Sequence, residues 1–212
     1  MKKAYIIITL LISTNLYTQN INKCGTTKLV NEELANNPDY VNGYNAVLEQ
    51  NKIWLNQNKQ KRNHATITLP VVVHIVHKDN HPLNIGTNIP DIQIEDALRI
   101  LNEDYSKTNP EFPNPPRNTF VNYAGNPNLK FCLATIDPNG NTTNGINRVA
   151  TTKSNFDKDT ESNDMKRSST LGADGWPPTE YINIWVCDIV NQGGGQILGY
   201  AYKPGLPSWN AW

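Results

Sequence analysis

The chain has 212 residues, of which 38% are hydrophobic and 18% charged, so it has enough apolar material for one folded domain of ordinary size. Lysine plus arginine and aspartate plus glutamate number 19 each, which gives no net charge. No overall field would therefore attract nucleic acid or an anionic membrane, and we expect neither as a partner. The abundance of Asn, Thr, Pro and Gly favours a loop-rich extracellular protein.

The N-terminus has the features of a secretory signal peptide. Lys2 and Lys3 precede an apolar run, Ala4–Ile12, that is too short to span a bilayer. We predict a signal peptide over residues 1–19 and a secreted protein that has no membrane attachment after cleavage. An uncleaved anchor is the alternative.

Residues 20–64 form a polar region with weak helical character. Apolar residues from Leu34 to Trp54 recur loosely at helical intervals among many Asn and Gln, which predicts one or two weak helices. The stretch Asn58–Asn63 has nothing to bury and is a candidate processing site or a solvated linker. Cys24 follows polar, bulky residues, which argues against lipid attachment.

The most continuous apolar run of the mature chain is Leu69–His77, whose β-branched residues predict a strand with both faces covered. Next, Ile92–Tyr105 has a helical apolar stripe, with Pro90 and Asp91 suited to its first turn. Asn128–Ile136 is predicted as a second strand. The fold class that follows is α/β.

The second half of the chain is predicted to continue the sheet. After the turn at residues 137–140, Gly145–Thr152 is predicted as a short returning strand and Tyr181–Ile189 as the third main strand. The charged residues 154–169 have no period and are expected to be a surface excursion. Leu198–Tyr202, rich in small residues, is predicted as an edge strand. Because the sequence ends on Trp209 and Trp212 without a polar tail, we expect that it is truncated.

The histidines do not indicate a metal site in this chain. His74 and His77 are three apart on a predicted strand and so point to opposite faces. His77, Asp79 and His81 could meet in a loop, and His64 is isolated, but packed or hydrogen-bonded histidines are the simpler interpretation. No HExxH, G-x-S-x-G, phosphate-binding loop or C-x-x-C motif occurs.

Two further cysteines, Cys132 and Cys187, lie in predicted apolar strands. Export would permit a disulfide between them, but we favour free buried thiols. Thiols in the middle of a strand among large apolar residues are the unreactive kind, so neither is a good candidate nucleophile.

Five segments, in order and with matching gaps, resemble the upper catalytic subdomain of pappalysin-family zinc endopeptidases, a branch of the metzincins. They are Leu69–His77 (LPVVVHIVH), Ile100–Tyr105 (ILNEDY), Leu129–Pro138 (LKFCLATIDP) with Gly145–Arg148 (GINR), Tyr181–Val186 (YINIWV) and Leu198–Ala201 (LGYA). The resemblance implies a metzincin-like twisted mixed sheet with a packed helix, of α/β or α+β class, preceded by a weakly helical prosegment. Residues 20–64 would be the prosegment, and residues 65–212 the N-terminal, upper part of a catalytic domain.

The function implied by this resemblance is that of a secreted zinc-dependent metalloendopeptidase precursor that acts on protein or peptide substrates. In that family the next strand leads to HExxHxxGxxH, whose histidines hold zinc and whose glutamate polarises water. This chain contains none of those residues, so no catalytic residue is assigned and the chain alone is expected to be inactive. Calcium, which family members often bind, would also bind beyond Trp212.

The resemblance gives roles to two places in the chain. Lys23–Thr26 (KCGT) matches a cysteine-switch-like motif, so Cys24 would be an inhibitory zinc ligand in the latent form; a stray or dimerising cysteine is the alternative. The backbone of Gly199, Tyr200, Ala201 and Tyr202 would bind an extended substrate as an added strand; an edge strand without a ligand explains these residues as well.

Two other functions remain open. One is a secreted β-rich binding or adhesion module without catalysis, which would fold cooperatively from residue 65 onward. The other is an inactive remnant of the peptidase. The sequence does not indicate an oligomeric state.

Overall fold

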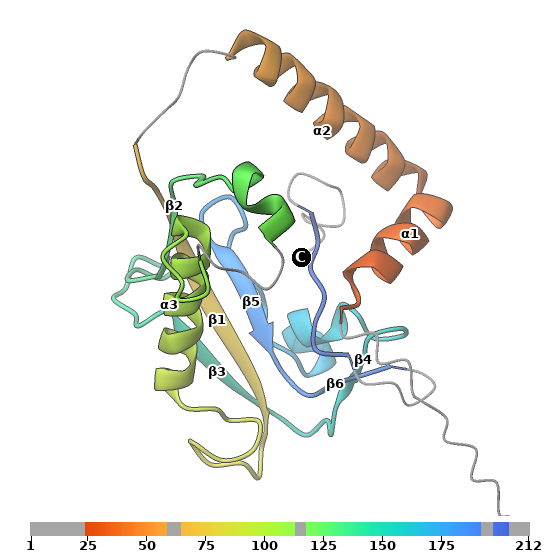
Figure 1. Cartoon of the computed structure of the whole chain (residues 1–212). Coiled ribbons are helices and arrows are strands. Elements are labelled where there is room, and N and C mark those ends of the chain that lie inside the picture. Colours follow the sequence, from red (N-terminus) through yellow and green to blue (C-terminus); the bar gives the residue numbers. More distant parts are fainter. Residues whose placement is uncertain (1–23, 59–64, 113–117, 192–196, 204–212) are drawn as a thin grey trace, which may run out of the picture.

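The computed structural model describes residues 24–58, 65–112, 118–191 and 197–203. The predicted signal peptide and most of the candidate processing stretch lie outside the described residues. Figure 1 shows a sheet with one helix packed on it and two N-terminal helices that extend away from it. None of the helices described is long and apolar enough to cross a membrane.

The described sheet is organised around β1 (Ile67–Lys78), the predicted buried strand. Three strands pair with it, all parallel: β2 (Leu129–Leu133), β3 (Ile146–Thr151) and β5 (Ile182–Val186). The α/β fold class is therefore confirmed, with parallel pairing throughout this sheet as far as it is described.

β2 and β3 follow one another along the same side of β1. The Val71 carbonyl accepts a hydrogen bond from Ala134, just after β2, and the Val73 amide donates to Gly145, just before β3. Because these two groups of β1 are two residues apart, they point to the same side of the strand. The other side of β1 pairs with β5, which makes β1 the central strand.

Beyond the carboxyl end of β1, the segments that follow its neighbours β3 and β5 pair with each other. β4 (Phe156–Asp157), which follows β3, pairs in parallel with β6 (Ile189–Val190), which follows β5. The Lys78 ammonium lies 2.9 Å from the Asp188 carboxylate at this end of the sheet. The two short strands therefore hold together the loops that extend past the carboxyl end of β1.

Side chains of β1 alternate between two apolar clusters. Val71, Val73 and Ile75 pack on one face with Ile94 and Leu98 of α3 (Asp91–Ser106). On the other face, a second cluster consists of Val76, Phe156, Met165 and Ala173. Both faces of the strand are thus buried, as its near-continuous apolar sequence predicts.

Between these apolar side chains the second face carries a buried histidine. The His74 ring accepts a hydrogen bond at Nδ1 from the Asn147 side-chain amide (3.0 Å) and donates from Nε2 to the Asn183 side-chain oxygen (2.8 Å). The ring also stacks on Trp185, with centroids 5.0 Å apart. Burial lowers the His74 pKa, so this histidine is neutral and is a packed, hydrogen-bonded residue of the core.

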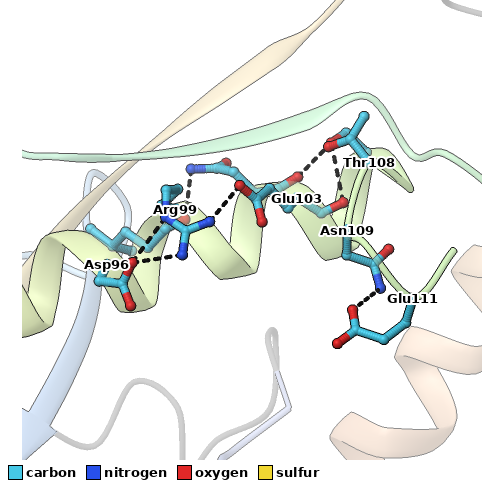
Figure 2. A network of polar contacts seen from close by, with 9 residues as sticks. Asp96, Arg99, Glu103, Thr108, Asn109 and Glu111 are labelled. Atoms are coloured by element: carbon cyan, nitrogen blue, oxygen red, sulfur yellow. Dashed lines mark hydrogen bonds and ion pairs between the residues drawn. The ribbon is translucent and has the colours of Figure 1, made fainter.

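The predicted helix is confirmed as α3, and its polar face carries a network of ion pairs (Figure 2). The Arg99 guanidinium lies 2.7 Å from Asp96 and 2.6 Å from Glu103, at helical spacings of three and four residues. Exposed pairs of this kind contribute only about 0.3–0.5 kcal/mol each. Burial of the opposite, apolar face therefore accounts for most of the stability of α3.

The N-terminal segment, Cys24–Asn58, forms two helices where one or two were expected: α1 (Thr26–Asn36) and α2 (Pro38–Gln57). Asn37 separates them and caps α2, because its side-chain oxygen accepts a hydrogen bond from the Tyr40 amide (3.1 Å). Pro38 occupies the first helical position, where the missing N–H costs nothing.

The expectation that residues 154–169 form a surface excursion is wrong. Phe156 and Met165 are 1% and 2% exposed and form part of the second cluster, beside the short 3-10 helices η2 (Asp164–Lys166) and η3 (Ser168–Thr170). The two apolar residues are nine positions apart among charged neighbours, so no period marks them in the sequence. A further 3-10 helix, η1, spans Asn118–Tyr123.

Cys132 and Cys187 are free thiols, as favoured from the sequence. Burial raises the pKa of the Cys187 thiol to about 12, which keeps it protonated and unreactive.

Shortening a side chain in the first cluster should destabilise the protein strongly. Ile75 is fully buried, so we expect Ile75→Ala to lower the free energy of unfolding by about 2–5 kcal/mol through lost burial and a residual cavity. Ile92, also an isoleucine but 68% exposed, is the matched control, and Ile92→Ala should change stability by less than about 0.5 kcal/mol. Urea unfolding of both variants measures the difference; equal effects would contradict the placement of β1.

Candidate functional site

The edge segment, Leu198–Tyr202, lies at the surface after β6 and is anchored by its tyrosines. The Tyr200 hydroxyl donates to the Ser162 carbonyl (2.5 Å), and the Tyr202 hydroxyl donates to the Asn163 side-chain oxygen (3.3 Å). Because alternate residues of an extended chain point the same way, both rings are directed toward residues 162–166.

The prediction of a regular strand over Leu198–Tyr202 is wrong for the described chain. The segment forms a single bridge, at Gly199, and its partner is Cys24 of the N-terminal segment. Its tyrosines bind the loop at 162–166 and its backbone faces the N-terminal segment, so no ladder with a strand of the sheet forms.

The structure thus brings together the two candidate sites predicted from the sequence. Cys24 and Gly199 pair in parallel, with the Gly25 amide donating to the Gly199 carbonyl (2.9 Å). The Ala201 amide in turn donates to the Thr26 hydroxyl oxygen (3.0 Å). The N-terminal segment therefore hydrogen-bonds to the same backbone groups of the edge segment that were predicted to bind an extended peptide substrate.

Gly25 is required at this contact by the lack of space. A Cβ on Gly25 would lie 2.3 Å from the Ile197 side chain, 3.0 Å from Lys158 and 3.3 Å from Tyr200. Its backbone angles are ordinary, so the reason for glycine is the close approach of the neighbouring chain.

The Cys24 thiol is exposed, and its environment favours the thiolate. The side chain and then the backbone amide of Thr26 hydrogen-bond to the sulfur and lower the Cys24 pKa. Thr26 therefore has two partners, the sulfur of Cys24 and the Ala201 amide. This arrangement places a sulfur with a lowered pKa beside the edge segment, and a thiolate is the form that binds metals.

A cluster of charged residues forms a second contact between α1 and the rest of the protein. The Asp159 carboxylate lies 2.6 Å from the buried Lys158 ammonium and 2.8 Å from Lys28 of α1. Hydrogen bonds from Lys158 and then Lys28 lower the Asp159 pKa, so the carboxylate stays ionised and holds α1 in place. Further along, the Lys203 ammonium lies 4.6 Å from the ring centroid of Tyr44 in α2.

A mostly apolar cavity of about 340 Å³ lies between β5 and the edge segment. Ile184 and Trp185 line one side of it, Leu198 and Tyr200 the other, and Met165 also borders it. A cavity of this composition can accept an apolar side chain.

The described residues contain no group of three or more His, Cys, Asp and Glu side chains that could hold a metal ion. The interpretation of His74, His77 and His81 as hydrogen-bonded residues is confirmed: the His77 ring contacts the Lys78 carbonyl (2.9 Å), and His81 accepts from the Thr87 amide (3.0 Å). His64 lies outside the described residues. Cys24, the predicted inhibitory metal ligand, is exposed, and its role as a ligand stays a prediction.

Solved structures of mirolysin, a metallopeptidase, resemble this chain in both sequence and fold. A promirolysin mutant of Tannerella forsythia is 36% identical with a TM-score of 0.61, and the match covers 86% of this chain and 54% of that one. The chain has the fold of promirolysin over the part that the two share.

Two structures of mirolysin match over a smaller share of the chain. Mature mirolysin of Tannerella forsythia in complex with a cleaved peptide is 41% identical with a TM-score of 0.51, covering 58% of this chain and 43% of that one. Mirolysin in complex with compound 9 is 42% identical with a TM-score of 0.53, covering 60% and 44%. The chain thus spans about half the length of the mirolysin chains that it matches. No family model matches the sequence, and neither does any curated protein.

The sequence did not reveal the polar residues that support the site. Lys158, Asp159 and Lys166 lie in the stretch expected to be a surface excursion, and their roles depend on contacts with residues that are distant in the sequence. No local signal marks them. Gly25, by contrast, is part of the Lys-Cys-Gly-Thr motif, although the reason for a glycine there is visible only in the fold.

Replacing Gly25 with alanine should loosen the N-terminal segment. The added methyl group must displace Ile197 or move the backbone away from Gly199, and overpacking of this kind costs about 1–3 kcal/mol. We expect trypsin to cleave after Lys28 about tenfold faster in Gly25→Ala, because cleavage follows the population of the opened segment.

Gly125→Ala is the matched control, since nothing lies within 4 Å of a Cβ at that position. Mass spectrometry of timed digests separates cleavage after Lys28 from cleavage elsewhere. Equal cleavage rates in both variants would show that the approach of Gly25 to Gly199 does not hold the segment.

Proposed function

We propose that this chain is the N-terminal part of the precursor of a secreted zinc-dependent metalloendopeptidase of the pappalysin branch of the metzincins. The match to promirolysin over 86% of the chain, against 58% for mature mirolysin, supports a precursor that includes a prosegment. On this proposal residues 1–19 are the signal peptide, residues 20–64 the prosegment, and residues 65–212 the upper part of the catalytic domain.

The observation that carries the proposal is the contact of Cys24, Gly25 and Thr26 with the edge segment. A peptide that adds as a strand to this edge needs the Gly199 carbonyl and the Ala201 amide. Both groups are already hydrogen-bonded to the N-terminal segment. The prosegment and a peptide substrate therefore exclude one another, which is the behaviour expected of a latent precursor.

Among the described residues, Cys24 is the one that we propose as a zinc ligand. Cys24 offers an exposed sulfur whose pKa is lowered, which suits a thiolate that completes a zinc site formed by residues outside this chain. When bound, zinc would activate water and polarise the scissile carbonyl. Within this chain, Gly199 and Ala201 would orient the peptide, and the cavity between β5 and the edge segment would take one of its side chains.

Secretion and calcium binding belong to the same proposal. Export rests on the basic start and short apolar run of the sequence, which precede the described residues. Calcium would be held, as zinc would, mainly by residues beyond Trp212. Mirolysin has been solved with a cleaved peptide, which supports protein or peptide substrates for this chain as well.

The full protein encoded by the gene tests the proposal directly. We expect the secreted precursor to hydrolyse a fluorogenic peptide only weakly, and Cys24→Ser to raise that activity about tenfold, because a serine hydroxyl is a much poorer zinc ligand than a thiolate. A zinc chelator should abolish the activity of both forms. Cys132→Ser, which changes a thiol distant from the edge segment, should leave the activity unchanged.

Three outcomes would count against the proposal. A gene that lacks HExxH downstream of Trp212, or a protein that stays inactive after removal of residues 20–64, would favour the inactive remnant. Metal-independent binding of a protein partner without cleavage would favour the adhesion module.

A further inference from the structure

Lys166 is a buried lysine that the proposed peptidase chemistry does not use. It is the last residue of η2 and is only 4% exposed. Its ammonium lies 3.9 Å from the ring centroid of Tyr202, 5.4 Å from that of Tyr200 and 6.0 Å from that of Trp185. Two of these three rings belong to the edge segment and the third to β5.

Hydrogen bonds connect the same groups. The Lys166 ammonium donates to the Asn163 side-chain oxygen (3.1 Å), which also accepts from the Tyr202 hydroxyl (3.3 Å). The lysine and Tyr202 are thus joined both through the ring face and through Asn163. Tyr200 is fixed separately, by its hydrogen bond to the Ser162 carbonyl.

Burial of the Lys166 amine costs desolvation free energy that burial of an apolar side chain would not. Removal from water lowers the Lys166 pKa to about 6, so the side chain is held in place by its hydrogen bond to Asn163 and its contacts with the rings rather than by a full charge. A methionine would fill a similar volume without that cost. The amine is therefore best explained by what it holds, namely the rings of the edge segment.

We propose that Lys166 is a positioning residue that holds the edge segment against β5 and η2. With the rings of Tyr200 and Tyr202 fixed inward, the Gly199 carbonyl and the Ala201 amide face Cys24–Thr26 of the N-terminal segment. Lys166 thereby sets the geometry of the backbone that pairs with the N-terminal segment. Its importance for a peptide substrate rests on the proposed function, whereas its effect on the N-terminal segment does not.

Amide hydrogen exchange of the 212-residue chain tests this inference without any need for catalysis. We expect Lys166→Met to speed exchange of the Gly25 and Ala201 amides about tenfold, because the variant loses the buried hydrogen bond to Asn163 and the contacts of the amine with the tyrosine rings. The Val73 amide, bonded to Gly145 in the central sheet, should keep its wild-type rate. Lys166→Arg, which retains N–H donors for Asn163, should restore slow exchange at Gly25 and Ala201.

Lys130→Met is the matched control, since Lys130 is exposed on β2 and its replacement should leave all three amides unchanged. Wild-type rates at Gly25 and Ala201 in Lys166→Met, or equal acceleration at Val73, would overturn the proposal. Failure of Lys166→Arg to restore protection would do the same.

If Lys166→Met does not fold, Tyr202→Leu replaces it, because that change removes the ring on which the amine lies. Exchange at Ala201 should again be about tenfold faster, and an unchanged rate would contradict the inference. Because these readouts do not require zinc or hydrolysis, a positive result stands even if the full protein proves to have no peptidase activity.

Discussion

Every other strand of the described sheet pairs with β1, so the position of the edge segment depends on how that one strand is buried. β1 has apolar clusters on both faces, β2 and β3 along one side and β5 along the other. The chains that leave β3 and β5 meet as β4 and β6 beyond its end, and the edge segment follows β6. A buried parallel strand thus fixes a surface segment more than a hundred residues later in the chain.

The contact between the N-terminal segment and the edge segment gives a physical role to three successive residues. Cys24 presents a sulfur with a lowered pKa, Gly25 permits close approach to Ile197, and Thr26 bonds both the sulfur and the Ala201 amide. Asp159 adds an ionic contact to Lys28 one turn further on. On the proposed function, two contacts then keep the precursor latent. The Cys24 sulfur would bind the metal, and the backbone of the N-terminal segment would block the Gly199 and Ala201 groups that bind a peptide.

Local sequence patterns were sufficient to predict those helices and strands whose own residues show a β-branched run or a helical apolar stripe. The β-branched run at Leu69–His77 predicted β1, and the apolar stripe after Asp91 predicted α3. The Cys24 motif was also recognisable. Its partner was not, because Thr26 and Ala201 are 175 residues apart and only the tertiary fold brings them together. Phe156 and Met165 were missed for a related reason, since isolated apolar residues in a charged stretch have no period.

The partner of the edge segment also could not be predicted from local sequence. The composition of that segment predicted an edge strand, but whether its backbone joins the sheet or another segment depends on what lies beside it. Lys166 is a further example, because a lysine in a charged stretch gives no sign that it will be buried under two tyrosine rings.

The most direct test of the central claim is the NMR scalar coupling across the hydrogen bond from the Gly25 amide nitrogen to the Gly199 carbonyl carbon. We expect this coupling to be detectable in the 212-residue chain, as should the one from the Val73 amide to Gly145 within the sheet. Detection of the Val73 coupling without the Gly25 coupling would contradict the claim that the N-terminal segment occupies the edge.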